Sequence, residues 1–143
     1  MLENRKVGIV LILLVCVCSA NCFILRTRDD GFPVRSIITI RTLQSQYASK
    51  HQGKFARNFD ELIKIVTLDE RFAGESPVVN GYVFEMTVTE PTGNKAAFYS
   101  IKANPRISEG FSATGTRSFY FDSTLGSIKY SEEGEANAQS PAV

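Results

Sequence analysis

The clearest hydrophobic pattern in the chain lies between residues 34 and 50. Four apolar side chains recur there at intervals of three and four residues: Ile37, Ile40, Leu43 and Tyr47. This spacing places them on one face of an α-helix. Pro33 suits the first turn because its missing N–H needs no partner there, and Gly53 suits the end because glycine tolerates a left-handed backbone. We predict a long helix with one face packed on a sheet.

A second, shorter helix is predicted to follow. Asn58 is a favoured N-cap residue, and Glu61 stands three positions later, where a capping-box partner belongs. Leu62, Ile63 and Val66 then supply the apolar residues of this helix.

Beyond residue 80 the period of the pattern changes to two, which indicates strands. The apolar face of the first run consists of Tyr82, Phe84, Met86 and Val88. A turn at residues 91–94 leads to a second run, whose apolar side holds Ala97, Tyr99, Ile101 and Ala103. The two runs therefore predict an antiparallel hairpin.

A second hairpin is predicted near the C-terminus. Its first strand alternates Phe119 and Phe121 with Ser118, Tyr120 and Asp122, and its second strand contains Ile128 and Tyr130. The predicted fold class is α+β: an N-terminal apolar helix, then a helix packed on a four-stranded antiparallel meander. Residues 132–143 contain no large apolar side chain before the terminal valine, so we expect a flexible tail.

The N-terminal segment 7–25 carries no charge. At 1.5 Å per residue, a helix of this length reaches about 28 Å, close to the roughly 30 Å of hydrocarbon in a bilayer. Two basic residues precede the segment, and the small residues Cys18 and Ala20 fit a signal-peptidase site. We interpret residues 1–25 as a membrane anchor or as a signal peptide cleaved near Ala20.

The remaining chain divides into three parts. Residues 26–33 contain charges, a glycine and a proline, as in a juxtamembrane linker; residues 34–131 form the folded domain and residues 132–143 the tail. Either interpretation of the leader exports the domain. The protein is then a single-pass membrane protein, or a secreted or periplasmic one if it is cleaved. Lipid attachment at Cys22 is a third, less favoured reading.

Composition limits the classes of partner and of chemistry. The chain of 143 residues has 16 Lys and Arg against 15 Asp and Glu, with a formal net charge of +1. Because positive and negative charges are interleaved, they create no strong positive potential that would attract a polyanion, so we expect no nucleic-acid partner. All three cysteines, Cys16, Cys18 and Cys22, lie in the leader, which leaves the domain without a disulfide or a thiol nucleophile.

The sequence predicts a protein without catalytic activity, cofactor or metal. His51 is the single histidine and is expected at a solvent-facing helix end. No HExxH, GxSxG or phosphate-binding glycine loop is present. Two acidic groups invite comparison with calcium sites: Asp60, Glu61, Asp69 and Glu70, and Asp122 with Ser123 and Thr124. Calcium requires about six to eight oxygens, so an ordinary turn at Asp122 is favoured.

Tyr120 is the candidate for an interaction face. Phe119 and Phe121 are expected in the core, which turns Tyr120 to the opposite side of the strand. There it is a cross-strand partner or, alternatively, part of a surface that binds another protein.

Four segments of the chain carry a more specific pattern: IRTLQSQYASKHQGKFARNFDEL, GYVFEMTV, AFYSIKANP and TGTRSFYFDSTLGSIKY. With the order of helix and meander, they resemble the globular domains of type IV pilins and of type II secretion pseudopilins, over roughly residues 33–130. The resemblance implies a pilin-like fold, a bacterial source and a place in the cell envelope. Pilins also carry a Gly-Phe-Thr-Leu-Ile-Glu type motif. Residues 7–25 contain no Glu and no Gly-Phe pair precedes them, so filament assembly is left open.

We therefore expect a structural or assembly protein of the cell envelope that resembles a minor pilin or pseudopilin. Its expected partners are the membrane, through residues 7–25, and other pilin-like subunits or envelope machinery. The alternative is a secreted or membrane-anchored binding module that uses the same fold to recognise a ligand through its sheet or loops.

Overall fold

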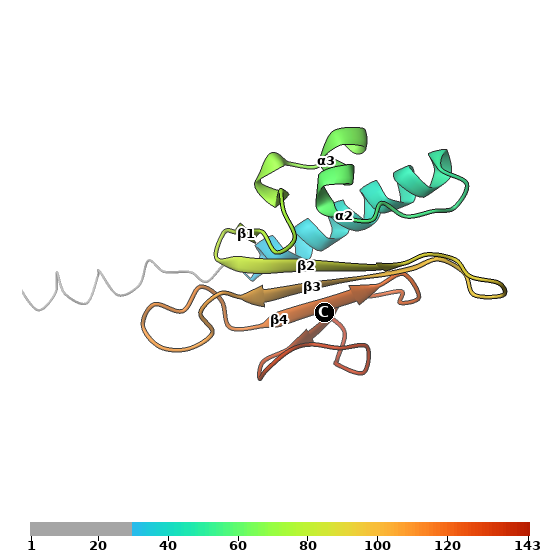
Figure 1. Ribbon diagram of the computed structural model, residues 1–143. Helices are drawn as coiled ribbons and strands as arrows, with labels where there is room; N and C mark the ends of the chain where they lie inside the picture. The colour runs from blue at the N-terminus through green and yellow to red at the C-terminus, as the bar shows by residue number, and fades with distance from the viewer. Residues whose placement is uncertain (1–29) are drawn as a thin grey trace, which may run out of the picture.

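The computed structural model describes residues 30–143, and within them the chain has an α+β fold (Figure 1). Helix α2 (Gly31–Lys50) is followed by α3 (Phe59–Val66) and the short 3-10 helix η1 (Glu70–Phe72). The predicted apolar helix of residues 7–25, with its anchor and cleavage alternatives, lies outside the described residues. Within those residues, no helix is both long and apolar enough to cross a membrane.

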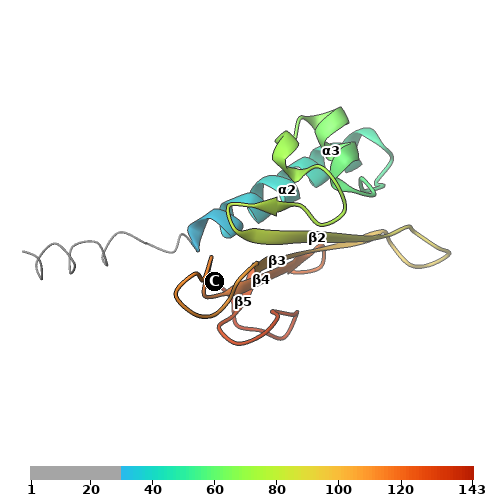
Figure 2. The ribbon, with the colours of Figure 1, turned by 60° about the vertical axis from the view of Figure 1, so that its left-hand side comes forward.

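The helices cover one face of a five-stranded antiparallel sheet, whereas we predicted four strands (Figures 1 and 2). The strands lie side by side in chain order: β1 (Val78–Val79), β2 (Tyr82–Thr89), β3 (Phe98–Pro105), β4 (Ser118–Asp122) and β5 (Lys129–Ser131). The additional strand is β1, which is too short to show a period of two.

A two-residue turn adds β1 to the sheet. Asn80 and Gly81 have φ angles of 49° and 81°. Positive φ at both central residues is the geometry of a type I′ hairpin turn, which Asn-Gly favours. Val79 pairs with Tyr82 across this turn. The Asn-Gly pair is the sequence signal that identifies the missed strand.

Helix α2 begins at Gly31, three residues before its predicted start, so the predicted linker 26–33 is too long at this end. Pro33 lies in the first turn, as expected. At the other end, the Ala48 carbonyl accepts hydrogen bonds from the amides of His51 and Gly53 at 3.2 and 2.9 Å. Gly53 has a φ of 80°, which confirms its predicted role in ending the helix.

The inward face of α2 confirms most of the predicted stripe. Ile37, Ile40 and Tyr47 are buried, but Leu43 is only half-buried. Gln44 is fully buried beside them, although it is polar. Its side-chain amide donates to the Ala56 carbonyl at 3.0 Å and accepts from the Ala56 amide at 2.9 Å. Since both halves of the amide are paired, burial leaves neither of them unsatisfied.

Helix α3 has the predicted N-cap. Asn58 Oδ1 accepts a hydrogen bond from the Glu61 amide at 2.9 Å. The reciprocal bond differs from a standard capping box, because the Glu61 carboxylate accepts from the Arg57 amide at 2.8 Å and not from that of Asn58. Asn58 is therefore the N-cap as predicted, and only the reciprocal bond reaches one residue further back than the pattern predicted.

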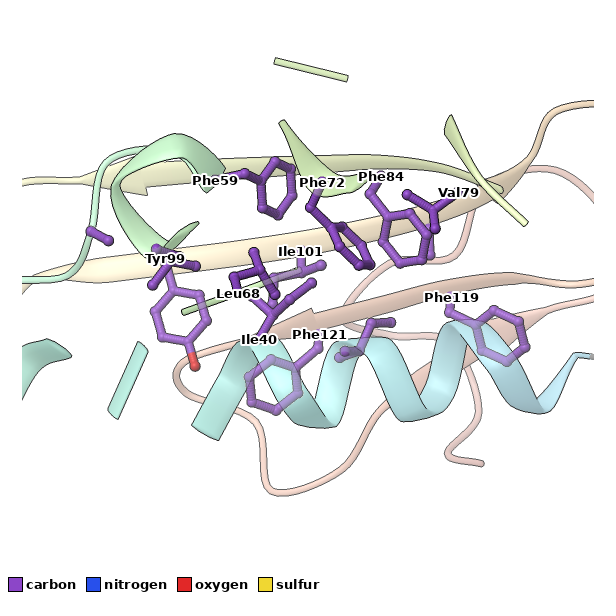
Figure 3. Close-up of a cluster of buried hydrophobic side chains, with 14 of the residues drawn as sticks. Ile40, Phe59, Leu68, Phe72, Val79, Phe84, Tyr99, Ile101, Phe119 and Phe121 are labelled. Carbon is purple, nitrogen blue, oxygen red and sulfur yellow. The ribbon is translucent and has the colours of Figure 1, made fainter. Parts of the chain in front are cut away.

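The core fills the space between the helices and the sheet (Figure 3). Phe72 of η1 lies edge-on to Phe84 of β2, with ring centroids 5.0 Å apart. Phe59 of α3 lies 6.0 Å from Phe72. In β4, Phe119 and Phe121 are buried opposite Ala103 and Ile101 of β3, which confirms the predicted inward side of this strand.

Residues 132–143, predicted as a flexible tail, fold back onto the sheet instead. Buried Ser118 donates to the Gly134 carbonyl at 2.6 Å and accepts from the Ala136 amide at 2.8 Å. Residues 141–143 then run antiparallel to the free edge of β5, where Lys129 pairs with Ala142. These contacts use backbone groups and small side chains, which a search for large apolar residues does not detect.

Candidate functional site

A polar cluster that joins three distant segments of the described chain lies at residue 30. Asp30 Oδ1 accepts a hydrogen bond from the Tyr82 hydroxyl at 2.7 Å, and Asp30 Oδ2 accepts one from the Thr116 hydroxyl at 2.7 Å. The amide of Thr116 also approaches Oδ1, at 3.4 Å. One carboxylate therefore joins the start of α2, the start of β2 and the connection that precedes β4. We refer to these three residues as the Asp30 junction.

The turn chemistry of the sequence positions each member of the junction. The Asn80–Gly81 turn sets the first residue of β2, Tyr82, at the edge of the core. Gly115 packs against the tyrosine ring: a Cβ atom at position 115 would lie 2.0 Å from the Tyr82 hydroxyl oxygen. Because no side chain fits there, Gly115 allows the backbone to bring Thr116 to the same carboxylate.

The junction favours the ionised form of Asp30. Partial burial alone would raise the pKa of this carboxyl group. The hydrogen bonds from Tyr82 and Thr116, with the nearby charge of Arg117, outweigh burial and lower the pKa below its ordinary value of 3.8. At neutral pH the cluster therefore holds a carboxylate with donors on both of its oxygens.

The connection between β3 and β4 is built on the same turn. Gly81 O accepts hydrogen bonds from the Arg106 amide at 2.8 Å and from the Thr114 hydroxyl at 2.6 Å. The Thr114 amide closes the connection by bonding to the Ile107 carbonyl at 2.8 Å. Residues 107–113 therefore project as a loop with a fixed base. Figures 1 and 2 place this loop at the end of the domain where α2 starts.

His51 lies at the end of α2, as predicted. Its ring stacks on Tyr47, with centroids 3.9 Å apart and the planes 11° from parallel. Its Nδ1 atom lies 2.8 Å from the Tyr47 carbonyl oxygen, which fixes the ring against the helix. Nδ1 of His51 is therefore engaged by the backbone of α2.

The acidic residues around α3, which the sequence suggested as one possible calcium site, have separate partners. Asp60 accepts from the Gly74 amide at 3.0 Å, and Asp69 pairs with Arg71 at 2.8 Å. Glu61 is used at the start of α3. Residues 30–143 contain no group of three or more His, Cys, Asp or Glu side chains placed to hold a metal ion.

Asp122 organises the turn after β4. Its Oδ1 accepts from the Thr124 amide at 2.8 Å and from the Thr124 hydroxyl at 2.6 Å, and its Oδ2 accepts from the Tyr120 hydroxyl at 3.0 Å. Burial would raise the pKa of Asp122, but these hydrogen bonds outweigh it and lower the pKa. The carboxylate has the contacts of a turn-forming aspartate, which is the favoured reading of the sequence.

Tyr120 lies on the sheet face opposite the helices. Its Cα pairs with those of Lys102 and Lys129 on the two neighbouring strands, and its side chain is half-buried. The predicted orientation is confirmed. The Tyr120 hydroxyl donates to Asp122 within the chain. That this face binds a partner stays a prediction.

A shallow hollow of about 360 Å³ lies between α2 and the segment that leads to η1. Phe32, Leu68 and Phe72 supply its apolar lining, and the other six lining residues, Arg71 among them, are polar or charged. The Arg71 guanidinium is already paired with Asp69. The hollow therefore offers apolar contacts rather than a free charge from Arg71.

The Asp30 junction was not predicted from the sequence. Its members are separated by 52 and 86 positions along the chain, and each has an ordinary local role. No protein-family model, curated protein or solved structure matches this chain.

Proposed function

We propose that the chain is a non-catalytic structural or assembly protein of the cell envelope, resembling a minor pilin or pseudopilin. The observation that carries the proposal is the Asp30 junction, which fixes the first turn of α2 to the sheet just after the uncharged segment 7–25. A domain held at this point would keep one orientation relative to an anchor. That property suits a subunit that must meet its neighbours in a defined way.

The arrangement of the domain gives further support. Helix α2 packs one face on an antiparallel meander, and its start lies at the end of the domain that would face the membrane. In this proposal residues 7–25 cross or enter the bilayer. The short polar stretch 26–29 would then set the domain close to the membrane surface.

The first experiment measures the intact mass of the protein recovered from washed membranes and from the soluble envelope fraction. A chain that keeps residues 1–25 and resists an alkaline wash supports the anchor. A soluble chain that begins near Asn21 supports the secreted alternative. Recovery of the full-length chain from the cytosol contradicts both.

The second experiment tests assembly. The three leader cysteines are replaced by serine, and a single cysteine is placed at the exposed position Ser45 of α2 or Asn94 of the β2–β3 loop. We expect a thiol cross-linker to join copies, or this chain and one envelope protein, from at least one position. Monomers from both positions in intact cells contradict an assembly role.

The alternative function is a binding module on the same fold. The hollow beside Phe32 and Phe72 favours it, because it offers about 360 Å³ next to apolar side chains. Thr39→Lys, at an exposed position of α2 that lines the hollow, should then abolish ligand binding without unfolding the domain or releasing the protein from the membrane. Under the preferred proposal, the same change leaves cross-linking intact.

A further inference from the structure

The two ends of the domain carry loops of opposite character. The β2–β3 loop at the far end has a tip of six exposed residues, 91–96, with no large apolar side chain. The β3–β4 loop, at the end where α2 starts, exposes 80% of Phe111 and 43% of Ile107. Exposed loops are usually polar, so the exposure of Phe111 and Ile107 in one loop is unusual and indicates a contact surface.

The base of the β3–β4 loop is tied to the point where the domain begins. Thr116 donates to Asp30 at 2.7 Å, and Thr114 and Arg106 bond to Gly81 beside it. The exposed Phe111 is thus at most five residues from a residue that contacts Asp30. Both views of the ribbon place this loop at the end of the domain where α2 starts (Figures 1 and 2).

Chain length limits how far this end can be from the segment 7–25. Five residue steps separate Leu25 from Asp30, which span at most about 18 Å when fully extended. If residues 7–25 enter a bilayer, the start of α2 lies within about that distance of the hydrocarbon boundary. A loop that projects from this end toward the bilayer can therefore reach the headgroup region.

We propose that Phe111 and Ile107 insert into the lipid headgroup region and hold the domain upright on the bilayer. Aromatic and aliphatic side chains of interfacial segments bury about 5 to 10 Å into the boundary between headgroups and acyl chains. Arg106, exposed at the base of the loop, can reach headgroup phosphates. In this proposal Phe111 and Ile107 contact the same bilayer that residues 7–25 enter.

This inference rests on the proposed anchor, and it adds a second contact between domain and membrane. The Asp30 junction would fix the domain at one point, and the loop would restrict its tilt at another. The partner is lipid, so the contact requires neither a second copy of the chain nor envelope machinery.

The absence of tryptophan from the sequence allows a direct test. Phe111→Trp places a single fluorescent reporter at the loop tip, and Asn94→Trp places a matched reporter at the exposed far loop. The full-length variants are reconstituted in vesicles of phosphatidylcholine and phosphatidylglycerol that contain lipids brominated near the headgroup. Flotation measures membrane attachment, and tryptophan quenching measures contact with lipid.

We expect both variants to float with the vesicles, and only Phe111→Trp to show blue-shifted emission and quenching by brominated lipid. Floating protein with neither reporter quenched overturns the lipid contact but leaves the anchor standing. Quenching of both reporters overturns the upright arrangement, because the domain then lies on the surface. Protein that does not float overturns the anchor and this inference together. A Phe111→Trp reporter that is shielded from aqueous quencher but not quenched by brominated lipid overturns it in favour of a protein partner.

Discussion

The hydroxyl of Tyr82 lies 2.7 Å from Asp30 Oδ1, although 52 positions separate the two residues in the chain. This bond connects the first strand after the Asn80–Gly81 turn with the residue that precedes α2. Thr116 adds a second donor to the same carboxylate. The junction therefore depends on three segments being correctly folded at once, which makes it a sensitive reporter of the whole domain.

Gly115 is the position where the junction is most easily disturbed. The Cβ of Gly115→Ala would lie 2.0 Å from the hydroxyl oxygen and 2.5 Å from Cζ of Tyr82. Because the ring is buried, it cannot move away without loss of packing, so we expect destabilisation of about 1–3 kcal/mol. Gly126→Ala is the matched control, since no atom lies within 4 Å of its Cβ. Urea denaturation measures both, and equal stabilities would contradict this packing.

The pH dependence of stability should report the ionisation of Asp30. Its folded pKa lies below the ordinary value of 3.8, so ionised Asp30 stabilises the folded state. This contribution is complete above that ordinary pKa and is lost as the pH falls through the folded one. Asp30→Asn should therefore cost about 1 kcal/mol at pH 7, and the difference from the wild type should shrink below about pH 4. A difference that is constant from pH 7 to pH 3 in urea titrations would contradict the assignment.

The features that could be predicted from the sequence depend on local periodicity. Ile37, Ile40 and Tyr47 identify the inward face of α2 because a helix repeats every 3.6 residues. Phe119 and Phe121 identify the inward side of β4 because a strand repeats every two. These patterns need no information about the rest of the fold.

The features that could not be predicted depend on distant partners. Gln44 interrupts the apolar stripe and is buried only because the Ala56 backbone satisfies its amide. The residues after 131 pack through the hydroxyl of Ser118 and through backbone groups, so hydrophobicity gives no sign of them. The sequence assigns Asp30 to the linker 26–33, whereas its partner Thr116 lies 86 positions away. No local pattern contains the information that joins these groups.

Two isoleucines of α2 provide a matched test of its packing. Ile40 is fully buried, whereas Ile38 on the same helix is 50% exposed. Ile40→Ala leaves a cavity in the core and should lower the free energy of unfolding by about 2–5 kcal/mol. Ile38→Ala should cost less than about 1 kcal/mol in the isolated protein. Melting temperatures that fall equally would show that the inward face of α2 is misassigned.

The docking of the C-terminal segment should depend on Ser118. Its buried hydroxyl bonds to the Gly134 carbonyl and to the Ala136 amide, so Ser118→Ala leaves two backbone groups without this partner. We expect a cost of about 1–3 kcal/mol and faster hydrogen exchange at the amide of Ala136. Ser112→Ala, at an exposed position of the β3–β4 loop, is the control and should change neither quantity. If the Ala136 amide already exchanges at the rate of an unstructured peptide in the wild type, the segment is a free tail, as the sequence alone suggested. If it is protected in the wild type and equally protected in Ser118→Ala, the pairing of residues 141–143 with β5 holds the segment without the serine.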